Sequence, residues 1–185
     1  RELSVDNILR ADTNLAKLAS LKPAFDKRSG KGTLTAGNST NLSDGASVAL
    51  LSSEQWAHDN NKEIQAYMVD AQVAAVDFVA GEGLLMAPAW AVAQLLKRNN
   101  LKLQDFDFYE IHEAFAAQVL CTLKAWESDE FCKTKLGMDG ALGSIDRSKL
   151  NVVGSSLALG HPFAATGARI LATAAKLLKE KGQGR

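Results

Sequence analysis

Residues 151–181, NVVGSSLALGHPFAATGARILATAAKLLKEK, decide the fold class of this chain. Residues 151–159 form an apolar run of strand length, and residues 162–181 carry apolar side chains at helical spacing. Pro162 suits the first turn of a helix, so His161 is expected at the junction of a buried strand and a long helix. A strand followed directly by a helix is the repeating unit of α/β proteins.

The same alternation extends upstream. Strands are predicted at residues 46–51, 64–79 (as one strand or two) and 106–111, and helices at 53–60, 88–98 and 113–126. This order favours an α/β layered domain. Because the last predicted helix has no strand after it, at least one further strand is expected beyond Arg185.

Composition restricts the classes of function. The 185 residues are 46% hydrophobic, and 21 Lys and Arg balance 21 Asp and Glu, so bulk charge gives no reason to expect nucleic-acid binding. No transmembrane run or secretory leader is seen. Residues 1–31 resemble a weak helix and a basic loop, and we expect the compact unit to be residues 32–185.

Two histidines are the main candidates for chemistry. The positive end of a helix that starts at Pro162 would disfavour a charged His161, and a neutral imidazole is what a general base needs. His112, followed by Glu113, occupies the same kind of strand-to-helix junction and could donate a hydrogen bond to an oxyanion. The alternative for each histidine is a capping side chain. His58 is interpreted as a solvated surface residue.

Other motifs are weaker. Residues 35–40, TAGNST, could hold a cofactor's amides or phosphates, or simply form a tight turn. No spacing typical of metal ligands occurs, so no metal is predicted. Cys121 and Cys132 do not form a CxxC motif and are expected to be ordinary thiols of a reducing compartment.

Three segments together resemble the thiolase family. They are TLTAGNSTNLSDGASVALLSSE (33–54), HEAFAAQV (112–119) and SLALGHPFAATGARI (156–170), in the family's order and with suitable spacing. The His of HEAF and the HPFAATG sequence most resemble the long-chain 3-ketoacyl-CoA branch, which includes the thiolase subunits of fatty-acid oxidation complexes.

The resemblance implies a C-terminal thiolase domain, built on a mixed five-stranded sheet with helices on both faces and here lacking its last strands. Residues 1–31 would be the tail of the preceding domain. The implied reaction cleaves a 3-ketoacyl-CoA with free CoA, through an acyl-enzyme on a cysteine, to acetyl-CoA and a shortened acyl-CoA. CoA would be a co-substrate, with no covalent cofactor.

The resemblance also implies roles for individual residues. His161 would be the base, His112 would line the oxyanion site, and Glu113 would orient the site through a hydrogen bond. Ala36, Gly37 and Thr40 would lie along CoA, and Phe163 would line the acyl pocket.

The family's cysteines are expected outside this chain, so residues 1–185 alone are expected to be inactive. Implied partners are the N-terminal thiolase half, a second copy of the chain, and the hydratase/dehydrogenase subunit of a β-oxidation complex. The implied location is the cytoplasm, or the mitochondrion in a eukaryote. Alternatives are a non-catalytic CoA or lipid carrier, a dimerisation module, or an enzyme that pairs Cys121 with His161.

Overall fold

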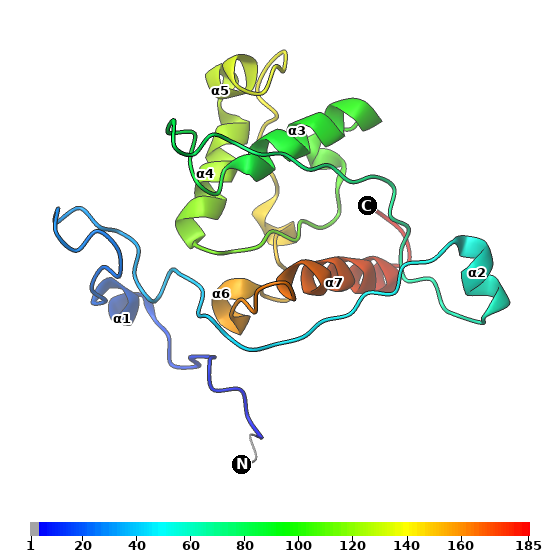
Figure 1. The fold of residues 1–185 in the computed structure, drawn as a ribbon, viewed down its shortest axis with the longest axis horizontal. Coiled ribbons are helices and arrows are strands. Elements are labelled where there is room, and N and C mark those ends of the chain that lie inside the picture. The colour runs from blue at the N-terminus through cyan, green and yellow to red at the C-terminus, as the bar shows by residue number, and fades with distance from the viewer. Residues whose placement is uncertain (1–3) are drawn as a thin grey trace.

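The computed structural model describes residues 4–185, and the regular secondary structure of these residues consists of helices. The helices are α1 (Leu15–Ala19), α2 (Glu54–Asp59), α3 (Ala87–Asn99), α4 (Ala116–Glu127), α5 (Asp129–Thr134), α6 (Ser156–Leu159) and α7 (Thr166–Lys181), with short 3₁₀ turns η1 (Leu103–Asp105) and η2 (Arg147–Lys149). In Figure 1, α3, α4 and α5 form one group, α6 and α7 lie apart from it, and α1 and α2 stand at opposite ends.

The core lies among α3, α4 and α5. Its buried residues are Ala89, Leu96, Leu103, Val119, Leu123, Ala125, Trp126 and Ile145. The Trp126 indole Nε1 donates to the Ala89 carbonyl at 3.4 Å, and Trp90 meets Phe131 edge-on with ring centroids 5.3 Å apart. Apolar side chains of α3 and α4 recur at helical spacing, so each helix has an apolar face, and these faces pack against each other.

The five-stranded sheet expected from the sequence is not observed in residues 4–185, which contain isolated β-bridges and no strand. Residues 106–111 do lie parallel to the segment after η2, with one bridge between Tyr109 and Leu150. Residues 46–51 and 64–76 have no ladder, and Val48 and Val73 are 88% and 87% exposed. Apolar patterning is local, whereas a strand also requires a hydrogen-bonded neighbour.

Two boundaries near His161 also differ from the prediction. Residues 151–159 are not a strand: Asn151 has φ +48°, a turn leads to Gly154, and α6 follows. The long helix α7 begins at Thr166 and not at Pro162, so His161 is not its cap. The His161 ring still lies beside the first residue of this helix, because its Nδ1 is 2.7 Å from Thr166 Oγ1.

The short helices agree better with the sequence. Helix α2 has Ser53 as its N-cap, with the Ser53 Oγ accepting from Trp56 N at 3.2 Å, as the expected start at residue 53 requires. Helix α3 carries Pro88 in its first turn and ends at a left-handed Asn100.

Candidate active site

A single extended piece of chain joins the segments that carry the two histidines. We call residues 38–42 the bridging segment. Asn38 O accepts from Ala116 N at 2.9 Å, and Thr40 N donates to Ala114 O at 3.0 Å. On its other side, Asn41 O accepts from His161 N at 2.9 Å. The three motifs found in the sequence are therefore in contact through backbone hydrogen bonds.

The imidazoles of His112 and His161 lie against each other. Their ring centroids are 4.1 Å apart and their planes are inclined by 39°. Both side chains are half-buried. The Nδ1 atom of His112 lies 2.7 Å from Ser156 Oγ, and that of His161 lies 2.7 Å from Thr166 Oγ1. Each ring is thus held at Nδ1 by a buried hydroxyl, which leaves Nε2 for another partner.

Glu113 is fixed beside the histidines. Its Oε1 accepts from Asn151 Nδ2 at 2.7 Å, and its Oε2 accepts from Leu157 N at 3.1 Å, in the first turn of α6. Asn151 also exchanges two hydrogen bonds with the backbone of Ile111, at 2.9 Å each. Glu113 therefore ties the segment after residue 111 to the segment that leads to His161.

The electrostatics favour an uncharged His112. Burial lowers the pKa of His112 below its ordinary value, and His161 and Arg169 lower it further, while Glu113 opposes them. Burial also raises the pKa of Glu110, with Glu113 adding to the increase and Arg169 opposing it. A neutral imidazole can donate from one nitrogen and accept at the other.

Not all predicted residues lie at the histidine pair. Phe163 does: its ring centroid is 4.6 Å from that of His161, and the side chain is 72% exposed. Thr40 belongs to the bridging segment, next to His161's partner Asn41. Ala36 and Gly37 lie further back, where a Cβ on Gly37 would come within 2.5 Å of Leu18 Cδ2.

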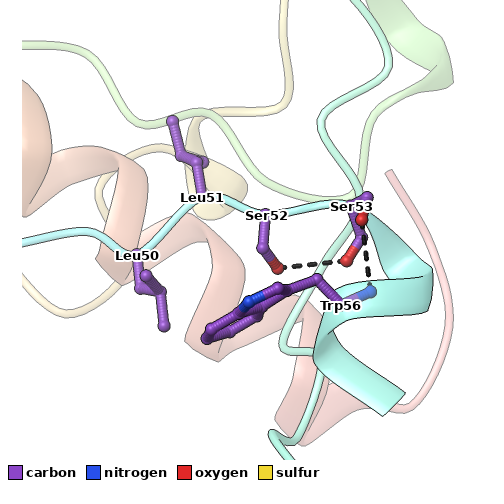
Figure 2. A pocket seen from close by; sticks show the side chains of 5 residues that line it. All are labelled: Leu50, Leu51, Ser52, Ser53 and Trp56. Atoms are coloured by element: carbon purple, nitrogen blue, oxygen red, sulfur yellow. Dashed lines mark hydrogen bonds between the residues drawn. The ribbon is translucent and has the colours of Figure 1, made fainter. Parts of the chain in front are cut away.

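Two hollows in the described residues 4–185 lie away from the histidine pair, since neither is lined by His112 or His161. The larger, about 420 Å³, is lined by Leu18, Ala19, Leu21, Pro23, Gly32, Thr33, Thr35, Gly37 and Asn38. The other, about 280 Å³, is lined by Leu50, Leu51, Ser52, Ser53 and Trp56, and Figure 2 shows Leu50 beside the Trp56 indole and the hydrogen bonds of Ser53. The first adjoins the TAGNST turn.

Neither cysteine is linked to the histidines by a hydrogen bond in the described part of the chain. Cys132 is buried, with Sγ 3.5 Å from Ala125 O and 3.4 Å from Trp126 O. Cys121 is exposed on α4. Within residues 4–185, no three His, Cys, Asp or Glu side chains gather as metal ligands would. The helices of the same residues include none with the length and apolarity that a membrane crossing needs.

Sequence reasoning missed the residues that hold the site in place: Asn151, Ser156, Thr166 and Arg169. Arg169 Nη2 donates to Ser155 Oγ at 3.2 Å and to Ser156 Oγ at 3.0 Å. The only sequence signal was position, since Ser156 and Thr166 flank His161 in the same motif. Their pairing with particular rings depends on the turn before α7.

Comparisons with known proteins agree with the three motifs. The family model for the thiolase C-terminal domain matches residues 62–185, and the thiolase N-terminal domain model matches residues 1–55. A probable 3-ketoacyl-CoA thiolase of Caenorhabditis elegans is 46% identical over 184 residues, which are 99% of this chain and 40% of that protein. A 3-ketoacyl-CoA thiolase of Serratia proteamaculans is 43% identical over 183 residues, 99% of this chain and 41% of that protein.

Solved structures give the same result. The Bacillus anthracis acetyl-CoA acetyltransferase superimposes with a TM-score of 0.75 at 39% identity, over 94% of this chain and 38% of that one. Human mitochondrial 3-ketoacyl-CoA thiolase gives 0.75 at 32% identity, over 98% and 40%. The chain therefore spans about 40% of the length of the curated relatives described here.

Proposed function

Because the chain belongs to the thiolase family, we propose that it is the C-terminal part of an acyl-CoA C-acyltransferase that cleaves 3-ketoacyl-CoA with CoA. The products would be acetyl-CoA and an acyl-CoA shortened by the acetyl unit, as in fatty-acid β-oxidation. The observation that carries this proposal is the contact between His112 and His161, each held at Nδ1 and each leaving Nε2 for chemistry.

In this proposal the two rings divide the work. His161 accepts the proton of a cysteine of the complete protein as its thiolate attacks, and a proton is delivered to the departing acetyl-CoA carbanion. His161 then accepts the proton of CoA as CoA attacks the acyl-enzyme, and the released cysteine thiolate recovers it. His112 donates a hydrogen bond to the thioester oxygen as it becomes negative. Glu113, fixed by Asn151 and Leu157 N, orients the segment that carries His112.

The TAGNST turn is proposed to contact CoA through Ala36, Gly37 and Thr40. Support comes from the hollow lined by Gly37 and Asn38, and from a human mitochondrial relative solved in complex with CoA. Phe163, exposed beside His161, would meet the acyl chain.

Replacing Ala36 by Glu tests this contact, because the substitution puts a negative charge where the anionic ligand is proposed to lie. We expect weaker CoA binding by calorimetry, while Ala141→Glu, at another exposed alanine, leaves it unchanged. Equal affinity in both variants would exclude this face as the CoA site.

The activity itself is tested in the complete protein with His161→Asn. Loss of the base should reduce kcat for thiolysis about 10²–10⁴-fold. His58→Asn is the matched control, because His58 is exposed on α2. Residues 1–185 alone are expected to show no turnover, since neither thiol is hydrogen-bonded to a site histidine in the described residues. Full activity of His161→Asn would refute the proposed base, whereas absence of thiolysis in the complete wild-type protein would favour a carrier or dimerisation module.

The remaining assignments are also proposals. The thiolase N-terminal model extends to residue 55, but we propose that the structural division of the chain lies after residue 31, with residues 32–185 as the C-terminal domain, because residues 38–42 are hydrogen-bonded to Ala114, Ala116 and His161. Limited proteolysis of the loop at residues 27–31 tests this division. We further propose a homo-oligomer that pairs with an N-terminal thiolase half and with a hydratase/dehydrogenase subunit, in the cytoplasm or the mitochondrion. Its apolar exposed segments, such as residues 48–51, support an interface.

A further inference from the structure

Two buried hydroxyls contact the two neighbouring imidazoles, each at Nδ1. Ser156 Oγ lies 2.7 Å from Nδ1 of His112, and Thr166 Oγ1 lies 2.7 Å from Nδ1 of His161. Ser156 and Thr166 are both buried. A hydroxyl has one proton to donate and two lone pairs that accept, so its other partners decide whether it donates to the imidazole or accepts from it.

The second partner of Ser156 is a donor. Arg169 Nη2 lies 3.0 Å from Ser156 Oγ, and a guanidinium can only donate. Arg169 therefore uses one lone pair of the Ser156 hydroxyl, and because the described residues give that hydroxyl no other hydrogen-bond acceptor, its proton is donated to His112 Nδ1. An imidazole that accepts at Nδ1 carries its own proton on Nε2.

The second partner of Thr166 is an acceptor. Thr166 Oγ1 lies 3.3 Å from the Pro162 carbonyl oxygen, which can only accept. The Thr166 proton is directed to that carbonyl, and its oxygen then accepts from Nδ1–H of His161. His161 in this tautomer presents a bare Nε2 with a free lone pair.

We propose that Ser156, oriented by Arg169, and Thr166 are positioning residues that fix opposite tautomers of the two histidines. His112 then offers an Nε2–H donor, and His161 offers an Nε2 acceptor. This inference deepens the proposed function, on which it rests for its meaning, because an oxyanion needs a donor and a thiol needs a base.

The charges around the pair fit this arrangement. Arg169 acts electrostatically on Glu110. Both carboxylate oxygens of Glu110 and the Nε of Arg169 are buried and have no hydrogen-bond partner among the described residues. The other titratable groups that affect the pKa of His112 are Glu113, which raises it, and His161. Burial, His161 and Arg169 together lower the pKa of His112, so that ring is neutral at neutral pH and its tautomer is defined.

The test is a long-range ¹H–¹⁵N correlation spectrum of the full chain with ¹⁵N-labelled histidine at neutral pH. Protonated and bare ring nitrogens have well-separated ¹⁵N shifts, so the wild-type spectrum alone gives each tautomer. The expected result is Nε2–H for His112 and Nδ1–H for His161. The same tautomer on both rings would overturn the proposal, without recourse to any variant.

Variants then assign the cause. Ser156→Ala should remove the single-tautomer pattern of His112 and leave that of His161. Thr166→Val should remove the single-tautomer pattern of His161 and leave that of His112. Thr166→Ser, which keeps the hydroxyl, should retain the pattern of His161. Ser155→Ala is the matched control, because Ser155 also accepts from Arg169 and has no hydrogen bond to His112 in the described residues. An unchanged His112 in Ser156→Ala would refute the role of Ser156.

The readout does not involve turnover. A chain that shows the two tautomers but whose complete protein has no thiolytic activity would uphold this inference and overturn only the proposed function. An active complete protein whose two histidines have the same tautomer would uphold the proposed function and overturn this inference.

Discussion

Asn151 Nδ2 lies 2.7 Å from Glu113 Oε1, and the same amide exchanges two hydrogen bonds of 2.9 Å with the backbone of Ile111. Asn151 is buried and has φ +48°, a left-handed conformation that Asn adopts more readily than most residues. One side chain therefore fixes the turn before α6 and the position of Glu113.

We predict that Asn151→Ala lowers the free energy of unfolding by about 2–4 kcal/mol, because it leaves half-buried polar groups of Glu113 and Ile111 without their partner. Asn61→Ala is the control, since Asn61 has φ +50° but is exposed, so it shares only the backbone cost. Chemical denaturation of both variants measures the difference. Equal losses would show that the side-chain hydrogen bonds contribute nothing.

The stability of the chain should depend on pH through His112. Its pKa is lowered in the folded state, so the unfolded chain binds the proton first as the pH falls below about 6.5. This contribution is fully present above that pH and is lost as the pH falls towards the folded-state pKa. Denaturation from pH 7.5 to 5 should therefore show a smaller loss in His112→Gln than in the wild type. Parallel curves would contradict the lowered pKa.

Gly160 should be essential to the contact between the bridging segment and His161. A Cβ at residue 160 would overlap the Ser43 hydroxyl and come within 3.0 Å of Ser43 Cβ. Gly154 has a similar φ, +83° against +87°, but open space around it. Gly160→Ala should therefore destabilise the chain more than Gly154→Ala, by about 1–3 kcal/mol, the usual cost of overpacking.

The readout for the glycine pair should include hydrogen exchange at the His161 amide, which donates to Asn41 O. We expect faster exchange in Gly160→Ala and unchanged exchange in Gly154→Ala. Unchanged exchange in both would mean that residues 41 and 160 adjust without losing this hydrogen bond.

The core between α3 and α4 can be tested on a single helix. Leu123 is 4% exposed and belongs to the core, whereas Leu120 on the same helix is 48% exposed. Leu123→Ala should cost about 2–5 kcal/mol of unfolding free energy, and Leu120→Ala much less, because only the first leaves a cavity. Thermal denaturation of the two variants compares them; similar losses would argue against this packing.

The sequence predicts the helices better than the strands. The start of α2 at Ser53 and the apolar faces of α3 and α4 follow from capping and spacing, which are properties of neighbouring residues. Apolar runs such as residues 46–51 predict strands, and the family resemblance implies the five-stranded sheet, but these runs have no ladder in residues 4–185. Pairing depends on residues distant in sequence, which a local pattern does not specify.

The sequence likewise predicts the histidines and the glutamate of the candidate site but not the residues that support them. His112, Glu113 and His161 could be identified because each lies in a recognisable motif. Their supports could not, because Asn151 reaches Glu113 across a left-handed turn, and α7 begins four residues later than Pro162 indicated. The contacts of the Ser156 and Thr166 hydroxyls with Nδ1 of the two histidines depend on that geometry, and no single motif predicts them.

The bridging segment has a consequence for how the molecule reaches its native state. Its hydrogen bonds connect residues 38–42 to partners far along the chain, at Ala114, Ala116 and His161. Closing such long loops is slow, whereas helices form from local contacts. The two imidazoles therefore come together only after most helices exist, and refolding should restore helical circular dichroism before it restores their mutual contact.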